Sequence, residues 1–286
     1  MTIASDDRSF TVALIQTCTG RDVDRNLREI GALISDAAAA GAQYVQTPEV
    51  TTVLETDSRR MPNVIEPEAG NRALAHYAQL AKDLGIWLHI GSMAVTTDEP
   101  RYANRAFLFA PTGQIVAKYD KIHMFDVQIG EGQVYQESKR YAPGKSAVLA
   151  ELPWTTLGIT ICYDMRFPAL YRALAQSGAE VIAVPSSFTV PTGKAHWHTL
   201  LRSRAIESQC FILAAAQAGD HECNRQTYGH SIAISPWGEV LAEADGETTG
   251  FISAEINLAA VKEARARVPS LDNDQSFDIV RAVPIL

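Results

Sequence analysis

The stretch Thr155-Thr-Leu-Gly-Ile-Thr-Ile-Cys-Tyr-Asp-Met-Arg-Phe-Pro168 joins an apolar, strand-like run to a helix-like segment. Cys162 lies where the two meet. A cysteine at a strand-to-helix turn stands near the positive end of a helix dipole, which favours its thiolate over its thiol. The pattern predicts a nucleophile at Cys162, whereas a cysteine in an apolar strand without such context is more commonly a small buried hydrophobic residue.

The same order of elements occurs twice along the chain, and the second occurrence begins with this strand. The first half predicts strands at 12–18, 41–49 and 86–90, helices between Asp24 and Gly41 and at about 71–84, and a hairpin of 106–110 with 115–118. The second half predicts strands at 155–161, 181–184 and 210–214, helices at about 168–177 and 196–208, and a hairpin of 231–235 with 240–243. Asp24 is the expected cap of the first helix.

Helices that alternate with apolar strands, followed by a hairpin in each half, indicate an α/β fold of two mixed sheets. We expect a four-layer α-β-β-α sandwich with an internal pseudo-twofold repeat. A doubly wound single sheet fits the alternation but leaves the paired hairpins unexplained. Because no Pro/Gly/Ser-rich linker divides the chain, residues 1–286 are expected to form one domain, with an irregular polar tail from about residue 260.

Composition narrows the class of protein. The formal net charge of -8 argues against a nucleic-acid partner. No apolar run is long enough to cross a bilayer, and the first residues lack the pattern of a signal peptide. The four cysteines contain no Cys-x-x-Cys pair, which favours a reduced, cytoplasmic setting.

Two further reactive residues follow predicted strands, where α/β folds gather their functional groups. Glu49 follows Val45-Gln-Thr-Pro48, and Lys121 follows the strand near 115–118. A thiol needs a base, which Glu49 can supply, and Lys121 with the backbone N–H after the cysteine can hold an oxyanion. Taken alone, Glu49 is typical of a helix cap or a surface carboxylate, and Lys121 beside Asp120 is typical of a solvated charge.

The segments around these residues resemble the nitrilase superfamily, the carbon–nitrogen hydrolases. The resemblance covers roughly residues 10 to 270 and rests on three segments, Thr47-Pro-Glu49, Tyr119-Asp-Lys-Ile-His-Met-Phe-Asp126 and Ile161-Cys-Tyr-Asp-Met-Arg-Phe-Pro168. It implies a Glu-Lys-Cys triad of Glu49, Lys121 and Cys162 in the four-layer sandwich, usually as a dimer or larger, with no metal or organic cofactor. It also implies that the cysteine attacks an amide carbonyl, that Lys121 and the Tyr163 N–H hold the oxyanion, and that water hydrolyses the thioester.

Many members of the family carry a second glutamate that orients substrate or supports the lysine. Glu137, in Tyr135-Gln-Glu-Ser138, matches its usual context best. Glu131 in the same loop is the alternative.

Finer matches point to one branch of the family. Four segments resemble the amidases that act on deaminated glutathione and, nearly as well, the omega-amidases: Phe188-Thr-Val-Pro-Thr-Gly193, Ala195-His-Trp197, Arg202-Ser-Arg-Ala-Ile-Glu-Ser-Gln209 and Tyr228-Gly-His-Ser231. Hydrolysis of an N-carbamoyl amide is a further alternative. True nitrilases usually carry a tryptophan after the nucleophile, so Tyr163 counts against nitrile substrates. One departure, the acidic run Asp272-Asn-Asp-Gln-Ser-Phe-Asp278 where relatives tend to be basic, leaves subunit contacts and the exact substrate open.

Both favoured substrates are α-keto acids with an amide further along, so the pocket is expected to bind a carboxylate. Arg166, four residues past the nucleophile, is the candidate because a guanidinium binds a carboxylate in a fork. The alternative is a structural ion pair between Arg166 and Asp164.

Other classes of protein have weaker support in the sequence. A metal hydrolase would use the four residues His196, His198, His221 and Cys223. His-x-His places two rings on different faces of a helix, which disfavours that site. A serine hydrolase lacks its Gly-x-Ser-x-Gly motif. A thiol acyltransferase, which passes the thioester to an amine, and a binding module on an inactive fold are the remaining alternatives.

Overall fold

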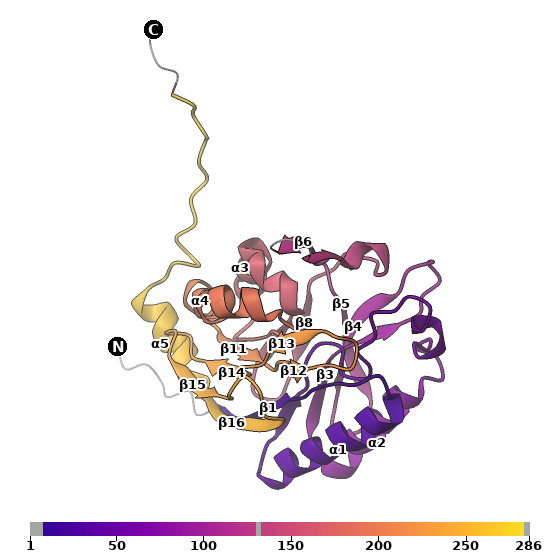
Figure 1. Cartoon of the computed structure of the whole chain (residues 1–286). Coiled ribbons are helices and arrows are strands. Elements are labelled where there is room, and N and C mark those ends of the chain that lie inside the picture. The colour runs from indigo at the N-terminus through magenta and orange to yellow at the C-terminus, as the bar shows by residue number, and fades with distance from the viewer. Residues whose placement is uncertain (1–7, 130–132, 283–286) are drawn as a thin grey trace.

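The computed structural model describes residues 8–129 and 133–282 and contains two six-stranded mixed sheets (Figure 1). In order across the first sheet, the strands are β16 (Gly250–Asn257), β1 (Ser9–Gln16), β2 (Tyr44–Gln46), β3 (Trp87–Val95), β4 (Ala103–Phe109) and β5 (Ile115–Asp120). Across the second they are β15 (Val240–Glu243), β14 (Ile232–Ile234), β11 (Phe211–Ala214), β10 (Val181–Ala183), β9 (Thr156–Ile159) and β8 (Val148–Glu151). Two short hairpins, β6 (Asp126–Ile129) with β7 (Gln133–Gln136) and β12 (Ala218–Asp220) with β13 (Gln226–Tyr228), lie outside these sheets.

The two halves of the chain have equivalent sheets. Strands β1, β2 and β3 are parallel to one another, as are β9, β10 and β11, and an antiparallel hairpin follows each trio. The strand that completes each sheet, β16 beside β1 and β8 beside β9, is antiparallel. This arrangement is the predicted internal pseudo-twofold repeat and excludes a doubly wound single sheet.

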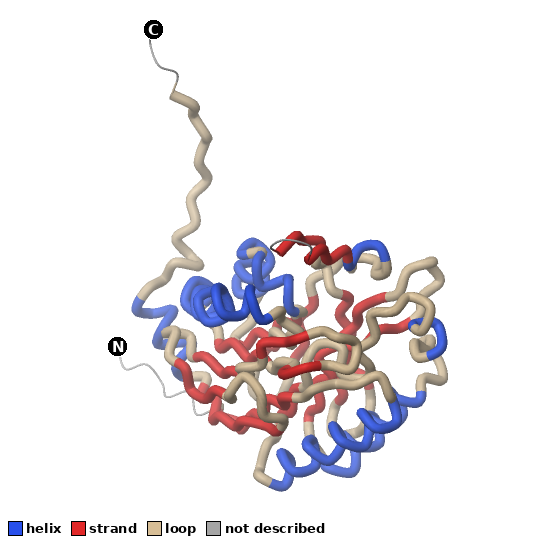
Figure 2. The backbone as a smooth tube through the Cα atoms, in the orientation of Figure 1, coloured by secondary structure: helices blue, strands red, loops and turns tan. Residues whose placement is uncertain are grey.

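Alternation along β1 shows how the layers pack. Val12 and Leu14 belong to a core that contains the buried residues of the second sheet. Ala13 and Ile15 point to the opposite face and pack with Ile34 of α1 (Val23–Ala39) and Tyr77 of α2 (Arg72–Leu84). On the far side, α3 (Pro168–Gln176) and α4 (Val190–Ser208) cover the second sheet (Figure 2). The four-layer α-β-β-α sandwich is therefore confirmed.

The start of α1 differs from the prediction. Asp22, not Asp24, is the cap, because its backbone is extended and its side chain accepts a hydrogen bond from the Arg25 N–H at 3.0 Å. Asp24 lies in the first helical turn and forms an ion pair with Arg72 of α2. The predicted end of α2 is confirmed, since Gly85 adopts a left-handed conformation with φ of 65°.

The segment after residue 250 is more ordered than predicted. Strand β16 pairs along the whole of β1, and α5 (Ala259–Arg267) follows it. Val261 and Ala264 are buried, so the helix docks through few apolar side chains, which explains why hydrophobic periodicity did not predict it. The irregular tail begins only after α5. Leu271 and Asp274 are still hydrogen-bonded to Gln176 of α3, and the chain beyond them extends away from the body of the molecule (Figure 1). None of the described helices is both long and apolar enough to cross a membrane.

Candidate active site

Four of the predicted site residues lie together in one cavity. Glu49 follows β2, Lys121 directly follows β5, and Cys162 follows β9 at the start of a short 3-10 turn, Cys162–Arg166. Glu137 begins another 3-10 turn after β7. All four line a cavity of roughly 820 Å³, including its open mouth. The fold therefore brings strand ends from both sheets to one place, as α/β folds commonly do.

Lys121 lies between two carboxylates. Its Nζ donates to Glu49 Oε1 at 2.8 Å and contacts Glu137 Oε1 and Oε2 at 3.1 and 2.9 Å. The side chain of Lys121 is only 2% exposed and that of Glu49 only 6%. Glu131, the alternative second glutamate, lies outside the described residues.

The charges of this group stabilise one another. Burial opposes ionisation of Glu49, but the ammonium of Lys121 outweighs it, so the pKa of Glu49 is lowered. Burial would lower the pKa of Lys121, yet Glu137 and Glu49 hold that pKa well above its ordinary value. At neutral pH the site therefore contains an ammonium and an ionised glutamate side by side.

Neighbouring groups fix both carboxylates in place. The Nδ2 of Asn104, on β4, donates to Glu49 Oε1 at 3.0 Å and to Glu137 Oε1 at 3.2 Å. The backbone N–H of Ser187 donates to Glu49 Oε2 at 3.0 Å, and that of Phe125 to Glu137 Oε2 at 2.6 Å. Sequence reasoning missed Asn104, because a single asparagine in an apolar strand carries no local signal of a site.

The backbone at Cys162 is constrained. Its φ is 48°, a left-handed conformation that a residue with a Cβ rarely adopts. Its N–H donates to the carbonyl of Pro185 at 2.9 Å, which ties the turn to the end of β10. Such strain persists only where surrounding contacts enforce it, and it is found mostly at functional sites.

The protonation state of Cys162 differs from the prediction. Burial, and then the negative charge of Glu49, raise the pKa of this thiol to about 12, although Lys121 acts in the opposite direction. The α-helix that was expected to follow the cysteine directly begins only at Pro168, after the 3-10 turn Cys162–Arg166. The resting group is therefore a thiol, and it needs a base to react.

Asp164 holds the cysteine turn against the first half of the chain. Its fully buried carboxylate accepts hydrogen bonds from the Tyr119 hydroxyl at 2.7 Å and from the Ile161 N–H at 2.9 Å. It also accepts the N–H of His123 at 3.0 Å and contacts the Nδ1 of that residue at 2.7 Å. The turn that carries Cys162 is thus joined to the segment after β5.

These contacts leave Asp164 no role as the partner of Arg166, so that alternative is wrong. The guanidinium of Arg166 lies 3.3 Å from His196 Nδ1 and over the rings of Tyr163 and Phe188, at 5.8 and 5.4 Å from their centroids. Phe188 lines the cavity, whereas Arg166 and Tyr163 do not. Arg166 therefore lies behind the cavity wall, and its binding of a substrate carboxylate stays a prediction, as does the oxyanion role of the Tyr163 N–H.

Two arginines that sequence reasoning missed do line the cavity. Arg225 donates to the Ser187 carbonyl at 2.6 Å and lies 5.9 Å from the ring centroid of Tyr135. Its buried Nε has no hydrogen-bond partner among the described residues. Arg140 donates to the Thr56 carbonyl at 2.6 Å. The lining has three cations, Lys121, Arg140 and Arg225, and three carboxylates, but the third carboxylate, Glu55, is paired with Arg21 and Arg60. The two arginines therefore offer positive charge to an anionic ligand.

The residues of the metal-hydrolase alternative are not gathered in the part of the chain that the structure describes. That set comprised His196, His198, His221 and Cys223. Both ring nitrogens of His221 are used locally, by the Thr19 carbonyl at 2.9 Å and the Thr227 hydroxyl at 2.7 Å.

Known proteins resemble this chain along most of its length. The model of the family described as "Carbon-nitrogen hydrolase" matches residues 11–266. The deaminated glutathione amidase of Yersinia enterocolitica is 38% identical over 272 residues, which are 94% of each chain. The omega-amidase NIT2-B of Xenopus laevis is 35% identical over 260 residues, 91% of this chain and 93% of that protein. The crystal structure of the C. elegans NitFhit protein has a TM-score of 0.86 at 31% identity, and the match spans 94% of this chain but 66% of that one.

Proposed function

Because the chain belongs to the carbon–nitrogen hydrolase family and is a hydrolase of C–N bonds other than peptide bonds, we propose that Cys162, Glu49, Lys121 and Glu137 cleave the amide of a small α-keto acid. The observation that carries this proposal is the buried ammonium of Lys121, held between two carboxylates in the same cavity as a buried thiol. That arrangement supplies a nucleophile, a base and a cationic donor without further groups.

The first half of the reaction forms a thioester. Glu49 takes the proton of the Cys162 thiol as the sulfur attacks the amide carbonyl carbon. An ammonium has three N–H groups. In Lys121 one donates to Glu49 and one is shared by the two oxygens of Glu137, so the third can donate to the oxyanion with the Tyr163 N–H. Collapse of the tetrahedral intermediate breaks the C–N bond, and Glu49 returns its proton to the departing amine.

The second half hydrolyses the thioester. Glu49, again a carboxylate, removes a proton from water as that water attacks the thioester carbonyl. Lys121 and the Tyr163 N–H hold the second oxyanion, which collapses with expulsion of the cysteine sulfur. The sulfur recovers its proton from Glu49, and a carboxylic acid leaves. Glu137 keeps Lys121 in position throughout and is a positioning residue.

Deaminated glutathione is our first candidate for the substrate. Relatives that carry this activity in their names match more than nine tenths of the chain. The unpartnered Nε of Arg225 and the guanidinium of Arg140 supply cationic groups for a substrate carboxylate. Arg166, behind Phe188, is the third candidate. An omega-amidase activity is the second candidate, favoured by the match to the omega-amidase NIT2-B.

We further propose that residues 1–286 act as one hydrolase domain, as a homodimer or larger assembly in the cytoplasm, without a metal or organic cofactor in the reaction. A core built from residues of both halves supports the single domain. The net charge of -8 favours a small-molecule substrate over nucleic acid.

The test compares kcat/KM for deaminated glutathione, α-ketoglutaramate and a simple amide without a carboxylate. We expect the first to be turned over best and Cys162→Ala to abolish turnover of all three. Cys210→Ala is the matched control, because burial raises the pKa of that thiol to about 12 as well, but Cys210 does not line the cavity. Full activity of Cys162→Ala would refute the mechanism, and equal turnover of the simple amide would refute the substrate class. Diversion of product to added hydroxylamine, at undiminished rate, would favour an acyltransferase.

A further inference from the structure

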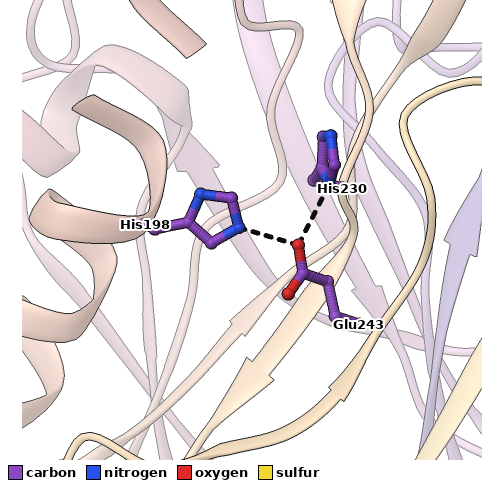
Figure 3. Close-up of side chains that lie close together, drawn as sticks. All are labelled: His198, His230 and Glu243. Atoms are coloured by element: carbon purple, nitrogen blue, oxygen red, sulfur yellow. Dashed lines mark hydrogen bonds and ion pairs between the residues drawn. The ribbon is translucent and has the colours of Figure 1, made fainter. Parts of the chain in front are cut away.

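Two histidines and a glutamate from three separate elements converge on one point outside the active site (Figure 3). His198 belongs to α4, His230 follows β13, and Glu243 ends β15. Glu243 Oε1 lies 2.7 Å from His198 Nε2 and 3.0 Å from His230 Nδ1. The three atoms all lie within 4.8 Å of one another, and Figure 3 shows both rings directed at the same carboxylate oxygen.

Hydrogen bonds connect the backbone segments that carry these side chains. Trp197, next to His198 in the chain, is fully buried and donates its indole N–H to the carbonyl of His230 at 2.9 Å. The N–H of His230 donates to the Asp245 carbonyl at 3.1 Å, and its φ of 57° is again left-handed. The ring of Tyr228 stands 4.4 Å from that of His230, between centroids. One buried indole therefore ties the two histidines together before any ligand binds.

The chemistry of this set suits a transition metal. Two imidazole nitrogens and one carboxylate oxygen are a frequent ligand set for Zn²⁺, with water in the fourth position. Metal–ligand bonds of about 2.0–2.1 Å place tetrahedral ligands about 3.3 Å apart. The contacts of 2.7 and 3.0 Å would open slightly to reach that spacing, and the two ring nitrogens, which lie within 4.8 Å of each other, would move to the same spacing. The side chains are 38%, 28% and 30% exposed, so an ion and its water have access.

We propose that His198, His230 and Glu243 bind one divalent transition metal ion of the Zn²⁺ class, in a structural site distinct from the active site. The alternative is a hydrogen-bonded bridge in which both rings donate to Glu243 and no ion binds.

The position of this site links it to the wall of the active-site cavity. None of its three residues lines that cavity, but Thr189, the N-cap of α4, and Thr192, in the first turn of that helix, do. Arg225 lines the cavity as well, and the strand β13 that follows it leads to His230. A bound ion joins α4 to the hairpin that carries Arg225. Its expected effect is a higher melting temperature, because a ligand that binds only the folded chain stabilises it.

The test uses full-length, tag-free protein in a Cys162→Ala background, so that the catalytic thiol cannot bind the ion. Titration calorimetry with Zn²⁺ and the absorption spectrum with Co²⁺ measure stoichiometry and coordination. We expect one ion per chain and a higher Tm with Zn²⁺. Loss of a group that only supports a metal ligand weakens metal binding roughly 10–100-fold. We expect a larger loss of Zn²⁺ affinity from each of the ligand variants His198→Ala, His230→Ala and the nearly isosteric Glu243→Gln.

Two matched controls keep the result specific. His196→Ala removes a neighbouring histidine of α4. Cys223→Ser removes a buried thiol that lies close to Cys18 and helps to raise the pKa of Cys18. Both should bind Zn²⁺ as the parent does. If the parent binds no ion, or if all three site variants bind as tightly as the controls, the proposal is wrong. Should an alanine variant fail to fold, Glu243→Gln decides the question. Because the readouts are binding and Tm, failure of the proposed amidase activity would not affect this test.

Discussion

Glu49 and Lys121 form an ion pair of 2.8 Å across two intervening strands, and both side chains are almost completely buried. A buried pair contributes little net stability, since desolvation offsets the attraction between the charges, but removal of one partner leaves the other charge uncompensated. The pair therefore fits the proposed role of both residues in the reaction at Cys162, whose pKa they move in opposite directions.

The pKa of the Cys162 thiol should fall when Glu49 is replaced by glutamine. The Glu49 carboxylate raises the pKa of the thiol and the Lys121 ammonium lowers it. Glu49→Gln removes the first effect and keeps the second, so the pKa falls. We expect iodoacetamide to alkylate this variant faster than the wild type below pH 10, even though its amidase activity is lost. The control is Glu55→Gln, which also lines the cavity but whose carboxylate pairs with Arg21 and Arg60. An unchanged rate of alkylation would show that Glu49 does not control the thiol.

Lys121→Met should be strongly destabilising. It leaves Glu49 and Glu137 buried without their cation, which is expected to cost about 3–5 kcal/mol in the free energy of unfolding. Lys118→Met, on the strand β5 that precedes Lys121, is the control, because Lys118 is 45% exposed and its pair with Glu68 is worth only about 0–1 kcal/mol. Urea denaturation measures both. Equal losses for the two variants would contradict the view that the buried group is a single charge network.

Activity should be nearly independent of pH from weakly acidic to weakly basic conditions. In the proposed mechanism the reactive state pairs the Glu49 carboxylate with the Cys162 thiol. The pKa of Glu49 is lowered from 4.5, so the base is lost only as the pH falls below that value. The pKa of the thiol is about 12, so no thiolate accumulates on the basic side. We expect kcat/KM to vary by less than about twofold between pH 6 and 9. A rise of about tenfold per pH unit in that range would indicate attack by a free thiolate instead.

Arg225→Gln should weaken the binding of substrates that carry a carboxylate. A charged hydrogen bond is worth about 1.5–3 kcal/mol, so KM for deaminated glutathione is expected to rise about 10–100-fold. The simple amide without a carboxylate is the internal control, and its KM should not change. Arg166→Ala, measured on the same pair of substrates, shows whether the arginine behind Phe188 shares this task. If either variant raises KM equally for both substrates, the arginine that it replaces does not bind the carboxylate.

The layers of the fold and the order of its elements could be predicted because they depend on local periodicity. Val12 and Leu14 alternate with Ala13 and Ile15, which is sufficient to indicate a sheet covered on both faces. The family resemblance was likewise predicted from contiguous segments around Lys121 and Cys162, and it is confirmed.

Features that depend on distant contacts could not be predicted. Asn104 reaches both glutamates only after β4 pairs between β3 and β5, and Arg225 reaches the cavity only through the fold of its hairpin. The high pKa of Cys162 also has no signal in the sequence, since it results from burial. Local pattern indicated a thiolate, and tertiary structure reversed that expectation.

Asp164→Asn should damage both stability and turnover. The carboxylate accepts hydrogen bonds from Tyr119, Ile161 and His123. An amide has one acceptor oxygen, so its NH2 must face another donor, and each buried group left unsatisfied is expected to cost about 1–3 kcal/mol. Because the turn held by this carboxylate positions Cys162, kcat should fall while KM changes little.

Asp120→Asn is the matched control for this variant. Asp120 precedes Lys121 and pairs with Arg105, but its side chain is 31% exposed, so its loss should be better tolerated. Thermal melts give the stability of both variants, and steady-state kinetics separate kcat from KM. An Asp164→Asn enzyme with normal kcat but a lowered Tm would mean that the carboxylate holds the two halves of the chain together without aligning the Cys162 thiol. If kcat of this variant falls in proportion to the rate of Cys162 alkylation, Asp164 is instead the residue that positions the thiol.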